Sequence, residues 1–303
     1  MAQYYAKTKF NMKNKHFFLA AIMAIAVSLI MTACNKNSSS EAPVTAGKQQ
    51  LSLYLTDGPA LFDKVLINIK SVKVLIDTCT NTRHHDNDDW DDHGEHENKK
   101  DSCLVWEDLK IKAGIYDILK FRNGADTLLA ASSITKGYIR LIKIELGTEN
   151  SLVKDSVTYP LALPAFAKNY VLLKLKGNEF DEFLPGKSRL WIDFDVNKSI
   201  YQGRDNRFYL SPRCHFFTVQ STGSIAGKVL PKEAYSVITV YNSKDTAYAL
   251  PNRDGYFKLR GLKDGTYSAF FNASNNGYRD TTITKIVVTA PNETSLGTIT
   301  LRK

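Results

Sequence analysis

The chain has 303 residues, with 40 Lys and Arg against 31 Asp and Glu and a formal net charge of +9. Its basic residues stand singly between apolar ones, as in KVLINIKSVKVLI at 64–76, and form no Lys/Arg block. Because nucleic acid binding needs a clustered basic surface, the composition excludes nucleic acid as a partner.

The N-terminus has the layout of a secretory signal. Lys13 and Lys15 stand before an apolar run from Phe17 to Met31, which is too short for a comfortable membrane span. The small residue Ala33 directly before Cys34 resembles a bacterial lipobox, in which the cysteine becomes the first mature residue and carries acyl chains such as palmitate. We therefore expect a signal peptide at 1–33 and a lipid anchor on Cys34. The alternative is an uncleaved helix with an incidental cysteine.

Residues 34–49 are small and polar, so the sequence predicts a flexible tether that leads from the membrane to the folded part. The expected location is the outer membrane, facing the periplasm or the cell surface. Asn35, Lys36 and Asn37 lack the acidic run associated with surface export in some lipoproteins, which favours the periplasm.

From Gln50 onwards, apolar residues recur at period two in short runs that Gly, Pro, Asn and Asp interrupt. No window carries a sustained helical stripe. The sequence therefore predicts an all-β fold with two antiparallel β-sandwich-like domains, at 50–221 and 222–303. The boundary lies near VQSTGSIAG at 219–227, after which the strands shorten and the turn signals come closer together.

In one predicted strand the apolar residues switch from odd to even positions. In the segment 64–76 the apolar residues fall on odd positions up to Ile69 and on even positions from Val72. A regular strand would turn one set to solvent. The pattern favours a β-bulge near Lys70 and Ser71, the alternative being a strand that is covered on both faces.

An acidic and histidine-rich insertion at 78–104 interrupts the first domain and is bracketed by Cys79 and Cys103. In an oxidising periplasm these cysteines are candidates for a disulfide that closes the base of the insertion. The alternative is a pair of reduced cysteines at strand ends. Cys214 would then remain single and buried between strand residues.

The insertion also holds candidate metal ligands. Residues 84–101 contain eight carboxylates and four imidazoles, which suit divalent cations of different hardness. An EF-hand read from Asp89 fails, because Lys100 stands where a bidentate Glu is required, and no HExxH motif is present. The choice lies between a weak divalent site and a solvated loop. The candidate ligands are His84, His85, Asp89, Asp91, His93, Glu95, His96 and Glu97.

Paired acids occur in LWIDFDV at 190–196, where a regular strand would place Asp193 and Asp195 on one face. Such a pair has the chemistry to hold a cation or to act as acid and base, and Asp57 in the TDGP turn adds a third carboxylate. The alternative is a polar outer face of an edge strand or hydrogen bonding to a neighbouring turn, with Asp57 acting only as a turn former.

We expect no enzymatic activity. The sequence contains no G-x-S-x-G motif and no glycine loop that would cradle phosphate. Cys214 is followed by His215, but adjacent strand residues point to opposite faces, so the thiol and the imidazole would not readily meet.

Two resemblances extend this interpretation. The first domain resembles bacterial lipoproteins of domain-of-unknown-function family 4382, which implies a β-rich domain behind a lipid anchor, with no agreed activity. The segments that carry it are LSLYLTDGP at 51–59, VLINIKSVKV at 65–74, GYIRLIKIEL at 137–146 and LWIDFDVNKSI at 190–200. The resemblance also implies that the acid pair and the TDGP turn recur together in the family.

The second domain resembles carboxypeptidase regulatory-like domains, a prealbumin-like β-sandwich family. The resemblance is carried by GSIAGKVLP at 223–231 and NRDGYFKLRGLKDGTYSAFF at 252–271. It implies a module that accompanies other domains on envelope proteins and rarely carries chemistry.

Taken together, these features predict a lipid-anchored protein of the cell envelope that acts as a non-catalytic binding or structural module. Its partner would be an unknown envelope protein or a glycan. The first alternative is divalent-metal binding or buffering by the insertion, with no other cofactor. The second is a carbohydrate-active hydrolase that uses Asp193 and Asp195.

Overall fold

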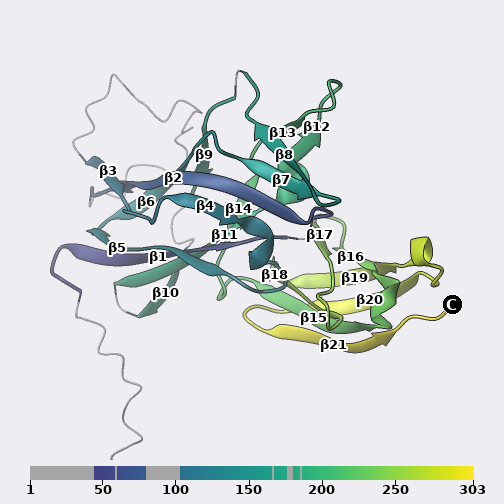
Figure 1. Cartoon of the computed structure of the whole chain (residues 1–303). Coiled ribbons are helices and arrows are strands. Elements are labelled where there is room, and N and C mark those ends of the chain that lie inside the picture. Colours follow the sequence, from purple (N-terminus) through teal and green to yellow (C-terminus); the bar gives the residue numbers. More distant parts are fainter. Residues whose placement is uncertain (1–43, 59, 80–102, 166, 176–179, 185) are drawn as a thin grey trace, which may run out of the picture. The chain divides into compact units, whose positions relative to one another are not determined.

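The computed structural model describes residues 44–303 except 59, 80–102, 166, 176–179 and 185 (Figure 1). In these residues the chain is all-β, which confirms the predicted fold class. The strands form four sheets, and the helical segments of this part are single turns. None of the helices within it has the length and apolar character needed to cross a membrane. These turns are η2 (Ile118–Phe121), α2 (Val196–Ser199), η3 (Lys232–Ala234) and η4 (Ser274–Asn276).

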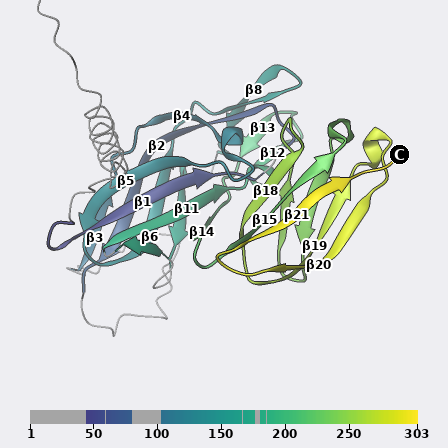
Figure 2. The ribbon, with the colours of Figure 1, turned by 90° about the horizontal axis from the view of Figure 1, so that it is seen from below.

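The first sheet has the order β10-β11-β1-β5, with β14 also beside β11. Its strands are β1 (Lys48–Thr56), β5 (Thr127–Thr135), β10 (Asp181–Leu184), β11 (Lys187–Phe194) and β14 (Cys214–Phe217). β1 and β11 run parallel and side by side, from Gln50 opposite Lys187 to Thr56 opposite Asp193 (Figures 1 and 2). The two strands are far apart in the sequence, but their C-terminal ends therefore lie side by side.

The second sheet is built around the long strand β2, with the order β12-β13-β8-β7-β2-β6-β9 and with β3 and β4 also beside β2. Its longer strands are β2 (Lys64–Asp77), β6 (Tyr138–Leu146), β8 (Val157–Ala162) and β9 (Tyr170–Lys174). Its shorter strands are β3 (Leu104–Asp108), β4 (Gly114–Asp117), β7 (Ser151–Lys154), β12 (Ile200–Gln202) and β13 (Phe208–Leu210).

The bulge predicted in β2 is confirmed. The register of β2 against β6 shifts between Ile69 and Ser71, so that Lys70 is the extra residue. The apolar residues on both sides of the shift are buried: Val65, Ile67, Ile69, Val72, Val74 and Ile76. The bulge thus turns both parities of the strand toward one core.

The third and fourth sheets follow in the sequence. The third has the order β18-β15-β21 and the fourth β17-β16-β19-β20. Their strands are β15 (Gly223–Leu230), β16 (Val237–Tyr241), β17 (Thr246–Ala249), β18 (Tyr256–Leu262), β19 (Gly265–Asn272), β20 (Thr281–Val288) and β21 (Glu293–Thr300). Pairing is mostly antiparallel, but β1 with β11, β8 with β13 and β15 with β21 are parallel, which the sequence pattern did not predict.

Two hydrophobic cores lie behind these sheets. The first is formed by strands before β15 and includes Leu53, Ile67 and Ile192, and the second is formed by strands from β15 onwards and includes Phe257 and Phe271. Each fully buried side chain of this size stabilises the fold by about 1.5–3 kcal/mol. Residues 44–303 nevertheless cluster as one compact unit, and the division at 221/222 stays a prediction. β1 begins at Lys48, inside the segment predicted as a tether.

Candidate functional site

The parallel pairing of β1 and β11 brings two of the predicted acids together. β1 ends at Thr56, Asp57 follows it directly, and Thr56 lies opposite Asp193 of β11. The Gly58 amide lies close enough to the Asp193 carboxyl group to lower its pKa. The TDGP turn and the acid pair of the sequence therefore belong to a single site, at the C-terminal ends of β1 and β11.

Asp57 is a buried carboxyl group without a partner. The residue is 6% exposed. Neither of its carboxylate oxygens has a hydrogen-bond partner among the described residues. Burial, and then the neighbouring Asp193, raise its pKa well above the usual range. The Val196 amide lowers this pKa through its proximity but does not reach hydrogen-bond geometry. A turn former alone would not need such burial.

Asp193 has the pKa of a group that titrates near neutrality. Burial is the largest cause and the Asp195 carboxylate the second, and together they raise its pKa from 3.8 to about 7. Lys198 and the Gly58 amide act in the opposite direction without cancelling the rise. The side chain keeps partial solvent access. Two carboxyl groups with raised pKa values thus lie next to each other at the strand ends.

Asp195 has a different role from Asp193. β11 ends at Phe194, and Asp195 is the N-cap of α2, where its carboxylate accepts from the Lys198 backbone N–H at 3.0 Å and from Lys198 Nζ at 2.7 Å. The hydrogen bond with Asp195 raises the pKa of Lys198. The prediction that Asp193 and Asp195 share a strand face is therefore wrong, because the chain leaves the strand to cap the next turn.

β11 is an interior strand of its sheet, so the interpretation of the acids as the outer face of an edge strand is wrong, whereas hydrogen bonding to a neighbouring turn is confirmed for Asp195. β14 pairs with it and places His215 opposite Asp193 and Cys214 opposite Phe194. His215 is exposed, whereas Cys214 is half-buried and packs against the first core. Burial, and then the nearby Asp193, raise the pKa of the Cys214 thiol, which is therefore a poor nucleophile.

A cavity of about 370 Å³ opens at these strand ends. Its lining includes Asp57, Asp193, Asp195 and His215, together with residues of β17 and β18. Its volume lies near the small end of the roughly 300–1,000 Å³ range of small-molecule sites. The candidate site is thus a polar cavity with acids in its lining.

An aromatic cluster that sequence reasoning missed adjoins the cavity. Trp191 stacks on Tyr54 with ring centroids 4.9 Å apart, and the Arg260 guanidinium lies 5.1 Å from the Trp191 ring centroid. Trp191 Nε1 and Arg260 both donate to Asp126 Oδ2 at 2.8 Å. The alternation of Trp191 with Asp193 showed only that the two share a face. No local signal connects that face with Arg260, which comes from β18.

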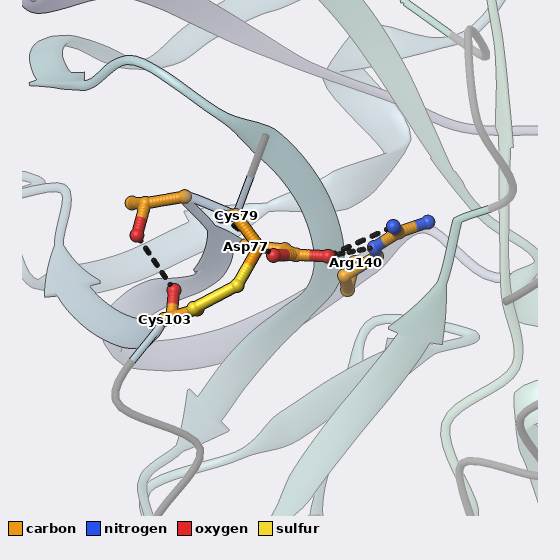
Figure 3. The surroundings of a disulfide bond; sticks show 5 residues. Asp77, Cys79, Cys103 and Arg140 are labelled. Carbon is orange, nitrogen blue, oxygen red and sulfur yellow. Dashed lines mark hydrogen bonds and ion pairs between the residues drawn. A yellow bond between two sulfur atoms is a disulfide. The ribbon is translucent and has the colours of Figure 1, made fainter. Parts of the chain in front are cut away.

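The predicted disulfide between Cys79 and Cys103 is present, with the two Cα atoms 5.3 Å apart (Figure 3). Asp77, the last residue of β2, lies beside it. One Asp77 carboxylate oxygen accepts from the Cys79 amide at 3.0 Å, and the other accepts from Arg140 at 2.9 and 3.2 Å (Figure 3). The Thr78 hydroxyl also donates a hydrogen bond to the Cys103 carbonyl oxygen at 2.9 Å. The base of the insertion is therefore held by a covalent bond and an ion pair.

The predicted metal ligands and the predicted lipid anchor lie outside the described residues. This applies to Cys34 and to the whole set His84, His85, Asp89, Asp91, His93, Glu95, His96 and Glu97. In the part of the chain that is described, no three His, Cys, Asp or Glu side chains are arranged to hold a metal ion. Both assignments stay predictions.

Fold and site together define an all-β protein with a carboxylate-lined cavity at the ends of two parallel strands. A family model described as "Domain of unknown function (DUF4382)" matches residues 48–212, which is more than half of the chain. The chain belongs to this family. No curated protein matches it.

Solved structures give only distant likenesses. A type II cohesin–X-dockerin complex from Acetivibrio cellulolyticus is 24% identical over 26% of this chain, with a TM-score of 0.22, and the chain covers 56% of that structure. Shaft pilin SpaA from Lactobacillus rhamnosus GG is 12% identical over 84% of this chain and 97% of its own length, with a TM-score of 0.21. Likenesses at this level carry no argument about function.

Proposed function

We propose that the chain is a lipid-anchored protein of the bacterial outer membrane whose folded part is a non-catalytic binding or structural module. The observation that carries the proposal is the division of roles among the three acids. All three acids line the cavity, but Asp195 is committed to Lys198 and to the cap of α2, whereas Asp57 keeps two carboxylate oxygens without a partner among the described residues. The sequence contains no motif of a catalytic nucleophile, and the cavity offers polar groups to a ligand.

The anchor and the location form the finer part of the proposal. They rest on the apolar run Phe17–Met31 and on Ala33 directly before Cys34. The tether would hold the module on the periplasmic face or at the cell surface. We assign residues 222–303 to a carboxypeptidase regulatory-like module on the strength of its motifs, which suits an accessory domain.

The anchor is tested in cells with Cys34→Ala, with Cys214→Ala as the matched control. Cys34→Ala should abolish palmitate incorporation and move the protein out of the detergent phase, because the tether has nothing else apolar to hold in a bilayer. Unchanged partitioning and labelling would refute the anchor. Cross-linking of the native protein in cells should capture a specific envelope partner, and the absence of any partner or bound glycan would refute the binding module.

A hydrolase remains the second candidate, because Asp193 has a pKa of about 7, a value that suits a general acid. If it is correct, the purified chain should release reducing ends from envelope glycans and Asp193→Asn should abolish the release. The proposed binding module predicts no release with either protein.

Metal binding by residues 84–101 is supported by the disulfide between Cys79 and Cys103, which would lower the ordering cost of a site between them. Calorimetric titration of zinc, nickel and calcium tests this alternative. The comparison variant replaces His84, His85, His93 and His96 by alanine. Tight stoichiometric binding that this variant loses would make metal handling the main function.

A further inference from the structure

The lining of the cavity holds an unusual acceptor. Asp57 is 6% exposed, lines the cavity, and has two carboxylate oxygens that lack hydrogen-bond partners within the described residues. Buried polar atoms in folded proteins are almost always paired, because leaving one unpaired costs about 1–3 kcal/mol. A group held in this way is prepared to bond to something that enters the cavity.

The charges around the cavity are largely balanced. Three of its cations are already paired: Lys198 with Asp195 at 2.7 Å, Lys258 with Glu293 at 2.7 Å and Arg260 with Asp126 at 2.8 Å.

The other charged groups of the lining are Asp57, Asp193 and Asp245 against Lys244 and Lys263. Burial raises the pKa of both Asp57 and Asp193, which favours their neutral forms. The cavity therefore presents little net field to a cation or an anion, and it favours a neutral polar ligand.

The lining also provides an aromatic surface. Tyr248 of β17 lines the cavity and is 42% exposed. An exposed aromatic ring beside hydrogen-bond acceptors offers an apolar face and polar contacts at once. Sugars are neutral molecules that carry both hydroxyl donors and apolar C–H faces. The exposed His215 and the hydroxyl group of Thr246 add further polar groups around the opening.

We propose that this cavity binds a neutral sugar or short oligosaccharide, with Asp57 accepting hydrogen bonds from its hydroxyl groups and Tyr248 packing against its ring. The inference rests on the proposed binding function and specifies its ligand. Asp193, beside Asp57, supplies a second carboxyl group that donates or accepts according to its protonation.

Saturation-transfer NMR on the full-length chain in detergent tests the proposal. The probes are neutral hexasaccharides of glucose, mannose, xylose and N-acetylglucosamine, with an oligogalacturonate as the charged comparison. The variants are Asp57→Asn and Tyr248→Ala. Tyr241→Ala is the matched control, since Tyr241 is 39% exposed on the neighbouring strand β16 and does not line the cavity.

At least one neutral probe should bind, and the oligogalacturonate should not. Asp57→Asn should raise the dissociation constant about tenfold and Tyr248→Ala at least about threefold. Tyr241→Ala should leave it unchanged. If Asp57→Asn fails to fold, Tyr248→Ala decides the question, because its exposed side chain contributes little to the core.

Two results would overturn the inference: no binding of any neutral probe, or binding that neither Asp57→Asn nor Tyr248→Ala weakens. A protein partner captured by cross-linking together with no sugar binding would refute the sugar ligand and leave the binding module standing. Finding neither a protein partner nor sugar binding would refute both the sugar ligand and the binding module.

Discussion

Asp77 and Asp57 stand at the ends of two strands and are equally buried, each with 6% of its surface exposed. The Asp77 carboxylate accepts hydrogen bonds from Arg140 and from the Cys79 amide. The Asp57 carboxylate has no such bond within the described residues. Equal burial thus has opposite consequences: Asp77 holds the base of the insertion together, whereas Asp57 costs the fold stability. A residue that costs stability is a candidate for function.

The largest expected effect comes from removing the paired acid. Asp77→Ala should lower the free energy of unfolding by about 3–5 kcal/mol, because it takes away the carboxylate that Arg140 and the Cys79 amide share. Urea denaturation measures it. Asp254→Ala is the control, since its ion pair with Lys232 is exposed, and should leave the midpoint unchanged. Equal effects of the two variants would remove the structural role of Asp77.

The disulfide comes next. Replacing Cys79 and Cys103 together by serine should cost about 3 kcal/mol, because the bond closes a loop with a sequence separation of 24 residues and limits the unfolded chain. Cys214→Ser is the control for removing a thiol that forms no disulfide. In urea denaturation, reductant should lower the midpoint of the native protein and leave the midpoint of the double variant unchanged. A native midpoint insensitive to reductant would count against the bond's contribution.

The pH dependence of stability tests the buried acids beside the cavity. Because the folded pKa of Asp193 is raised to about 7, the folded protein binds the proton more tightly than the unfolded chain, and stability falls as pH rises from 3.8 toward that value. Asp193→Asn should remove this fall. It should be more stable than the native chain by on the order of 2 kcal/mol at about pH 8, after allowance for partial exposure, with no gain below about pH 4. Urea denaturation from about pH 4 to about pH 8 measures the free energy of unfolding of both proteins. If the two proteins show the same dependence on pH, the pKa of Asp193 is not raised.

The smallest effect is expected at Arg260. Arg260→Lys keeps the charge but loses the planar group that lies over Trp191 and Phe217, and should cost about 1 kcal/mol and alter Trp191 fluorescence. Arg253→Lys is the exposed control. Unchanged fluorescence in both variants would show that the guanidinium does not order the aromatic cluster.

The features that were predictable from the sequence are those with a local cause. The shift of apolar parity at Ile69 and Val72 is a property of one strand, so it predicted the bulge at Lys70. Two cysteines around a hydrophilic insertion predicted the disulfide for a similar reason. The all-β fold follows from the same period-two pattern.

What could not be predicted depends on contacts between distant segments. Asp57 reads as a turn residue, and its burial depends on β1 lying parallel to β11, which no local pattern encodes. The end of β11 at Phe194 follows from a cap that Asp195 makes with Lys198, and this competes with the alternating pattern. Arg260 reaches Asp126 from a strand more than a hundred residues further along the chain.

The central claim is that Asp57 is kept for a ligand and not for the fold. The most direct test is the free energy of unfolding of Asp57→Asn against the native chain at about pH 8, where the raised pKa makes the ionised form most costly. We predict that Asp57→Asn is at least as stable as the native chain. A clear loss of stability would show instead that Asp57, like Asp77, holds the structure together.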